Sequence, residues 1–218
     1  MSELKDIPRQ KVLLDCGTQH QQGLNSMIEK LDVDESWIVH SFEANPHTYN
    51  AEIEKRIPWV NYHNLAVACA DTEVVMHCER EFGCDNPGTG GGSTMMPLEN
   101  WRTEKRYGEK PSYDKVRLQG FDLSKWITTT VNSGKWGIPE IYIKMDIEGA
   151  EIFVLDKMLG DGLLQTVIEQ EGRPPFLVVE KLFVEFHFDL VVNVDVSTQT
   201  QRIVQYFFKH KDQLEIWW

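Results

Sequence analysis

Long hydrophobic runs and closely spaced cysteines are missing from this sequence of 218 residues. No apolar stretch reaches the roughly 20 residues that span a bilayer. The first ten residues, MSELKDIPRQ, lack the apolar core of a signal peptide. The four cysteines form no CxxC pair and match no zinc-binding spacing. We therefore expect a soluble, reduced protein of the cytoplasm with no membrane span.

Positive charge is also scarce. The chain has 22 lysines and arginines against 34 aspartates and glutamates, which gives a net charge of −12. Such a surface repels phosphate backbones, so nucleic acid is not expected as a partner. The phosphate-binding motifs GxGxxG and Gly-Lys-Ser/Thr are absent as well, which argues against an NAD-linked oxidoreductase.

Apolar runs typical of strands alternate with segments of helical spacing, and the apolar fraction of 41% is sufficient for a core. The alternation predicts one doubly wound α/β domain over residues 1–218. Strands are expected at 11–17, 36–44, 60–70, 73–79, 115–121, 140–146, 181–188 and 213–218, and helices at 24–31, 46–57, 122–131, 149–159 and 198–210.

Residues 83–112 interrupt this pattern, because they are rich in glycine, proline and charge and have no clear period. A long loop of this kind is either a lid or substrate loop, or a mobile surface insertion. Four of its side chains could bind an acceptor by stacking or by hydrogen bonds, although ordinary loop packing would also explain them. They are Trp101, Arg102, Arg106 and Tyr107.

Ligands of doubly wound sheets bind beyond the carboxyl ends of the strands. The first strand ends in LLDCGTQHQQG, with Asp15, Gly17 and Gly23, and the second ends in SFEANP, with Glu43. Glycines let a backbone approach a ligand, and an acidic residue after the second strand accepts hydrogen bonds from ribose hydroxyls. No tight glycine pair is available for a pyrophosphate, so the pattern favours a nucleoside ligand without phosphates. A turn glycine followed by an unrelated surface glutamate is the alternative.

Acidic residues gather after the strand at 140–146. Asp146 ends that strand, Glu148 lies on the turn, and Glu151 opens the next helix. The negative charge of Glu151 would stabilise the N-terminus of that helix. In LFVEFHF, Glu185 and His187 share one strand face by the period of two. A carboxylate or imidazole here could act as general base, or the group could hold Mg²⁺ or Mn²⁺. Satisfied polar residues at a sheet end are the alternative.

The segment KMDIEGAE resembles the signature of the FkbM family of S-adenosylmethionine-dependent methyltransferases. LLDCGTQHQQGLNSM, SFEANP and LAVACADTEV are similar to the family's first three strand motifs, and GFDLSKWI and LFVEFH to its later blocks, in order from about residue 11 to 190. The resemblance implies a class I methyltransferase fold, which is Rossmann-like and has a doubly wound seven-stranded sheet with helices on both faces. It also implies S-adenosylmethionine as methyl donor.

Residue by residue, the resemblance implies that Asp15 and Gly17 lie beside the methionine part of the cofactor. Glu43 would accept hydrogen bonds from both ribose hydroxyls, and Asn45 would support the turn that follows Glu43. Asp71 would lie near the adenine.

The expected activity is O-methylation of a hydroxyl, with a sugar of a glycan or glycosylated metabolite as the favoured acceptor. The chain could act alone or as a domain of a larger glycan-modifying protein, and its oligomeric state stays open. The main alternative is a non-catalytic binding module, because Gln21 occupies the place of a glycine usual in the first motif.

Overall fold

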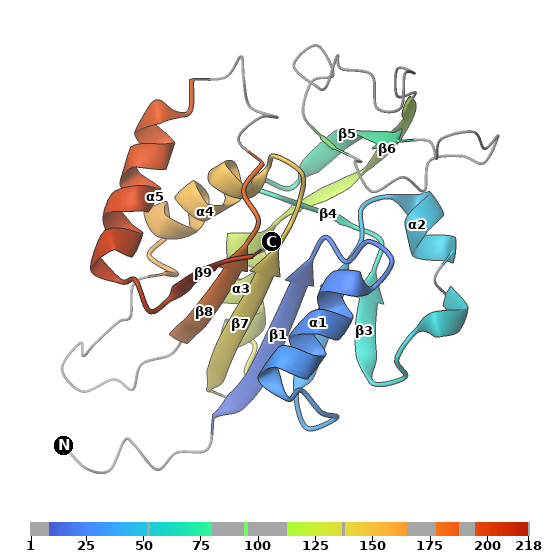
Figure 1. Ribbon diagram of the computed structural model, residues 1–218, viewed down its shortest axis with the longest axis horizontal. Coiled ribbons are helices and arrows are strands. Elements are labelled where there is room, and N and C mark those ends of the chain that lie inside the picture. Colours follow the sequence, from blue (N-terminus) through green and yellow to red (C-terminus); the bar gives the residue numbers. More distant parts are fainter. Residues whose placement is uncertain are drawn as a thin grey trace.

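A six-stranded parallel sheet forms the centre of the protein in the computed structural model, which describes residues 9–51, 53–79, 94–95, 113–136, 138–164, 178–187 and 195–217 (Figure 1). The strand order is β3-β2-β1-β7-β8-β9, and every neighbouring pair is parallel. The order reverses between β1 and β7, so the ends of these strands form the switch point where ligands bind in such folds. The strands are β1 (Gln10–Cys16), β2 (Ile38–Phe42), β3 (Val60–His63), β7 (Pro139–Met145), β8 (Val178–Val184) and β9 (Leu214–Ile216).

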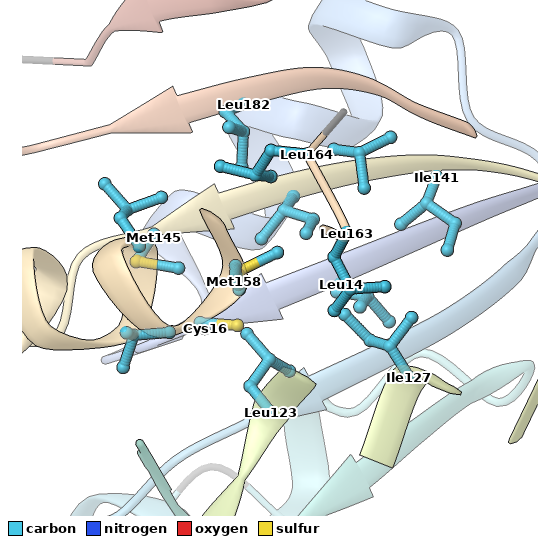
Figure 2. Close-up of a cluster of buried hydrophobic side chains, with 14 of the residues drawn as sticks. Leu14, Cys16, Leu123, Ile127, Ile141, Met145, Met158, Leu163, Leu164 and Leu182 are labelled. Atoms are coloured by element: carbon cyan, nitrogen blue, oxygen red, sulfur yellow. The ribbon is translucent and has the colours of Figure 1, made fainter. Parts of the chain in front are cut away.

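Helices cover both faces of this sheet, as expected for a doubly wound fold. Successive strand residues point to opposite faces. Val12, Leu14 and Cys16 of β1 therefore pack in a cluster with α3 (Leu123–Asn132), α4 (Glu151–Gly160) and α5 (Ser197–Lys209). Figure 2 shows the centre of this cluster, where Leu14, Met145 and Met158 lie together. Leu13 faces the other way and packs against Leu24 and Met27 of α1 (Gln22–Leu31).

A second, three-stranded sheet lies beside the main one, and its order is β4-β6-β5. It contains β4 (Ala66–Ala68), β5 (Thr72–Glu79) and β6 (Tyr113–Asp122). β5 and β6 pair antiparallel, whereas β4 and β6 are parallel. The expected number of seven strands is therefore corrected: among the described residues the main sheet has six strands, because β6 pairs with β4 and β5 in the second sheet.

Several element boundaries differ from those expected. The strand expected at 60–70 is divided into β3 and β4, because the Asn64 side chain donates to the carbonyls of Glu43 and Ala44 and turns the chain. The helix expected at 46–57 is shorter, with α2 (Pro46–Ala51) followed by a 3₁₀ turn, η1 (Ile53–Lys55).

The edge strand expected at 213–218 is present as β9. Within the described part of the chain, we find no helix with the length and apolar character needed to cross a membrane.

Candidate functional site

Gly17, at the end of β1, brings three strand ends into contact. Its φ is +82°, and a Cβ at this position would lie 1.7 Å from the carbonyl oxygen of Asp146. Its N–H donates to the carbonyl of Phe42 at 2.9 Å, and the N–H of Asp146 donates to the carbonyl of Cys16 at 3.0 Å. Glycine is therefore required where β1 meets the residues that follow β2 and β7.

The loop from Thr18 to Gln21 leads into α1. Gln21 has a φ of 60°, the left-handed conformation that glycine adopts most easily, and its Oε1 accepts from the hydroxyl of Tyr62 at 2.8 Å. Three buried polar atoms around this loop have no hydrogen-bond partner among the described residues. They are Asp15 Oδ1, Thr18 Oγ1 and Gln21 Nε2.

Glu43 follows β2 and is buried, with 8% of its surface exposed. Its carboxylate accepts from the backbone N–H of Asn45 at 2.7 Å and of Gln19 at 2.8 Å. Burial raises the pKa of Glu43 to about 7, against the opposing effect of these two hydrogen bonds and of Lys144. Asn45 Oδ1 in turn accepts from the N–H of His47 at 3.0 Å at the start of α2.

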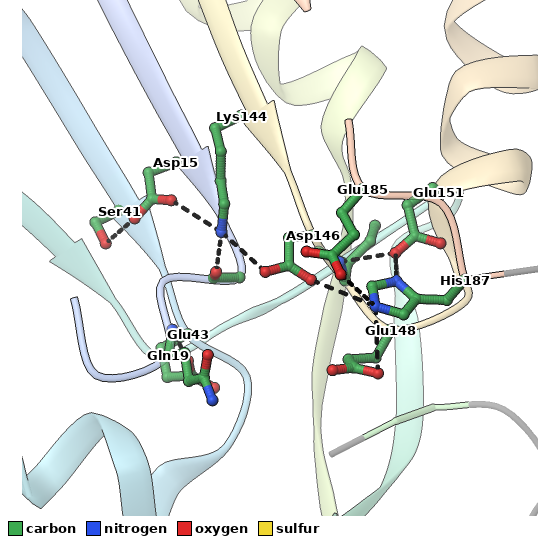
Figure 3. A network of polar contacts seen from close by, with 12 residues as sticks. Asp15, Gln19, Ser41, Glu43, Lys144, Asp146, Glu148, Glu151, Glu185 and His187 are labelled. Carbon is green, nitrogen blue, oxygen red and sulfur yellow. Dashed lines mark hydrogen bonds and ion pairs between the residues drawn. The ribbon is translucent and has the colours of Figure 1, made fainter. Parts of the chain in front are cut away.

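Lys144 joins the two halves of the site, because its amino group lies between Asp15 and Asp146 (Figure 3). Its side chain is 1% exposed, and its Nζ donates to the carbonyl of Gly17. The same nitrogen lies 3.3 Å from Asp146 Oδ2 and 3.6 Å from Asp15 Oδ1. Burial would lower the pKa of Lys144, but the charges of Asp15 and Asp146 outweigh it and raise that pKa. Gly23 packs on this lysine, because a Cβ there would lie 2.5 Å from Nζ.

Four ionisable side chains converge beyond the ends of β7 and β8 (Figure 3). His187 Nε2 lies 3.5 Å from Glu185 Oε1, 3.7 Å from Glu148 Oε2 and 3.9 Å from Asp146 Oδ1. The expectation that Glu185 and His187 share a strand face is corrected, because β8 ends at Val184. They meet the other acids from the segment that follows the strand. Glu148 has a φ of 52°, which is unusual for a residue other than glycine.

Glu151 holds the histidine from behind. Its buried carboxylate accepts from the N–H groups of Ile147 and Gly149, and its Oε1 lies 3.0 Å from His187 Nδ1. Burial would lower the pKa of His187, but the hydrogen bond with Glu151 and the charges of Glu148, Glu151 and Asp146 raise it to about 9. His187 is therefore charged near neutral pH, which argues against it as the general base.

A cavity opens between these strand ends and the small sheet, and its volume of about 590 Å³ includes space open to solvent. Glu43 contributes a carboxylate on one side, and Asp146 and Glu148 contribute theirs on the other. Among the described residues, no lysine or arginine lines it. The lining residues are Gly17, Gln19, Phe42, Glu43, Ala44, Asn45, Thr48, Leu65, Val67, Met76, Met95, Asp146, Ile147 and Glu148.

Three of the residues expected to bind the cofactor are absent from the lining of this cavity, and the first of them, Asp15, is fully buried beside Lys144. Gly23 contacts Lys144 instead, and Asp71 is absent from the lining. The exposed carboxylate of Asp71 pairs with Lys125 at 2.5 Å and accepts from the N–H of Asp122 at 3.0 Å. The four acceptor candidates of the 83–112 segment lie outside the described residues. They are Trp101, Arg102, Arg106 and Tyr107.

Sequence reasoning missed four contributors to the site, namely Lys144, Met76, Thr94 and Met95. Lys144 was visible as the one basic residue in an apolar strand, and a buried charge of that kind requires acidic partners. Met76 and Met95 line the cavity and carry no comparable signal in the sequence. Thr94 precedes Met95 and forms a bridge with His77, and its hydroxyl donates to the carbonyl of Glu148 at 2.6 Å.

Comparison with known proteins agrees with this geometry. Residues 15–214 match the family model described as the methyltransferase FkbM domain. Neither the curated proteins nor the solved structures give a match to the chain. The matched region includes all of the strand ends that form the cavity. The protein is a methyltransferase that belongs to the FkbM family.

Proposed function

We propose that the protein transfers a methyl group from S-adenosylmethionine to a hydroxyl oxygen, and that the acceptor is an uncharged sugar. The observation that carries this proposal is the cavity at the switch point, which has Glu43 on one side and Asp146 and Glu148 on the other. Three carboxylates and no basic side chain among its described lining favour a cationic ligand over an anionic one. The same carboxylates would repel the negatively charged diphosphate of a dinucleotide.

The residues at the end of β1 and β2 fit the donor. Glu43 presents a buried carboxylate, which suits the two hydroxyls of a ribose. Next to Gly17, Thr18 Oγ1 and Gln21 Nε2 are buried and have no hydrogen-bond partner among the described residues. A hydroxyl and an amide can donate to a carboxylate, and a hydroxyl can also accept from an ammonium, so the two suit the amino-acid part of the donor. The left-handed backbone at Gln21 supports a working cofactor loop in spite of the missing glycine, and it speaks against the non-catalytic alternative.

S-adenosylmethionine supplies a methyl group on a positively charged sulfur. The chain's own residues must hold the acceptor oxygen in line and accept its proton as the new O–C bond forms. Asp146 and Glu148 are suited to accept that proton, because their carboxylates line the cavity. General base catalysis of this kind contributes roughly 10²–10⁴-fold.

An uncharged polyol suits the acceptor side. Carboxylates repel acceptors that carry phosphate or carboxylate groups, and they accept hydrogen bonds from neighbouring hydroxyls. This argument concerns charge, so it distinguishes neutral sugars from sugar acids and sugar phosphates.

The first test is calorimetric titration with S-adenosylhomocysteine, with NAD as the comparison ligand. We expect binding of the former alone, and we expect Glu43→Gln to weaken it by more than tenfold, since each hydrogen bond to a charged group contributes about 1.5–3 kcal/mol. Glu73→Gln is the matched control, because Glu73 is an exposed acid of the small sheet that pairs with Arg117. Equal affinity in the two variants, or preferential binding of NAD, would overturn the proposed donor site.

The acceptor is tested by following the release of S-adenosylhomocysteine with neutral glycosides, uronic acids and sugar phosphates. Activity confined to the neutral glycosides is expected. A preference for the anionic sugars would refute the assignment of the acceptor.

A further inference from the structure

We propose that Asp146, Glu185 and His187 form a binding site for one divalent cation at the edge of the cavity. Each residue offers one ligand atom, and the three atoms lie within 4.8 Å of one another. They come from two separate segments, after β7 and after β8, which the parallel sheet brings together. One imidazole and two carboxylates are a donor set suited to Mn²⁺ and related ions.

The distances are close to those that a shared ion needs. Two ligand atoms that are each about 2.1–2.2 Å from one ion lie roughly 3–4.3 Å apart, depending on the angle between them. Nε2 of His187 lies 3.5 Å from the Glu185 carboxylate and 3.9 Å from the Asp146 carboxylate. Small side-chain rotations would place all three donors around one ion.

Glu151 provides an independent observation that distinguishes this group from a solvated acidic cluster. Its side chain is 1% exposed, and its carboxylate is fixed by the N–H groups of Ile147 and Gly149. From this position it contacts His187 Nδ1 at 3.0 Å, so the other nitrogen, Nε2, faces the carboxylates. A carboxylate that holds the non-ligating nitrogen of a histidine is the usual support of a metal-binding imidazole.

The position of the site indicates a role for the ion, and this role rests on the proposed function. Asp146 and Glu148 line the cavity, so an ion held by Asp146 would lie beside the space proposed for the acceptor. An acceptor hydroxyl bound there would lose its proton more easily. The proton would pass to Glu148, while the oxygen takes the methyl group and the C–S bond of the donor breaks.

The test is titration of chelator-treated protein with Mn²⁺ alone, without donor or acceptor, followed by calorimetry and by the loss of the free Mn²⁺ signal in electron paramagnetic resonance. We expect one ion per chain. Glu185→Gln and His187→Gln should each weaken binding at least tenfold, and Glu151→Gln should weaken it roughly 10–100-fold through the orientation of His187. Glu73→Gln should bind as the unchanged protein does.

Thermal unfolding of each variant checks that it is folded. Glu185 is the safest position, because its side chain is 38% exposed. The absence of Mn²⁺ binding, or equal binding in Glu185→Gln and Glu73→Gln, would overturn the metal site. A protein that binds S-adenosylhomocysteine but does not bind Mn²⁺ would refute this inference alone. A protein that binds Mn²⁺ but does not bind S-adenosylhomocysteine would refute the proposed function and leave the metal site standing.

Discussion

Replacement of Lys144 by methionine should be among the most destabilising single changes in this protein. The methionine fills a similar volume but leaves Asp15 and Asp146 without the cation that lies 3.6 Å and 3.3 Å from them. Asp15 is fully buried, and the carbonyl of Gly17 also loses its donor. Removal of one partner from a buried ion pair costs about 3–5 kcal/mol. This is a large share of the roughly 5–15 kcal/mol that stabilise a typical domain.

Urea unfolding followed by circular dichroism measures this loss of free energy. In thermal unfolding, the same loss should lower the melting temperature of a chain of this size by roughly 6–20 °C. Lys125→Met is the control, because Lys125 forms an ion pair with Asp71 in which both side chains are exposed. Exposed pairs contribute at most about 1 kcal/mol.

A second variant tests the electrostatic cause. If the loss arises from an uncompensated buried charge, Lys144→Met combined with Asp15→Asn should be more stable than Lys144→Met alone. Losses that simply add in the double variant, or a loss in Lys144→Met no larger than that in Lys125→Met, would refute the reasoning.

Three further predictions concern pH and the backbone. Because burial holds the pKa of Glu43 near 7, Glu43 is protonated below that pH, and the affinity for S-adenosylhomocysteine should fall by up to tenfold per pH unit; calorimetry should show no such trend in Glu43→Gln. Burial and the charge of His63 lower the pKa of His40 to about 4 and so keep it neutral. Its contribution to the free energy of unfolding is therefore complete above pH 6.5 and is lost as the pH falls toward 4. It amounts to at most roughly 3 kcal/mol, and urea unfolding across this range should show a smaller acid loss in His40→Phe. Gly17→Ala should destabilise the protein and weaken S-adenosylhomocysteine binding far more than Gly134→Ala, since both glycines have a positive φ but only Gly17 lies against another backbone; equal losses in the two would contradict this account.

The strands and helices of the main sheet could be predicted because buried parallel strands leave continuous apolar runs in the sequence. The second sheet could not, because whether β6 pairs with β5 or with a strand of the main sheet depends on partners distant in the sequence. The end of β8 was placed too late for a related reason. Apolar residues continue to Phe186 and Phe188, whereas the strand ends at Val184.

The candidate site was predictable where one strand end carries its own signal. Glu43, Gly17 and Asp146 each follow an apolar run, and the parallel sheet necessarily places such ends along one edge. Glu151 illustrates what local reasoning misses. Its place at a helix start explains its charge, but its contact with His187 joins residues 36 positions apart.

The small sheet carries a segment, between β5 and β6, that contacts the candidate site from outside the main sheet. β5 and β6 end as neighbours at Glu79 and Tyr113, so the chain between them leaves and returns at one place, and Thr94 and Met95 from that stretch contact the candidate site. Among the described residues, no strand of the main sheet, whose ends carry Gly17 and Glu43, pairs with β5 or β6. Insertions, deletions or exchanges between the two strands can therefore remodel one wall of the site as an interchangeable module. New acceptor preferences could then be engineered or evolve there without redesign of the nucleoside end.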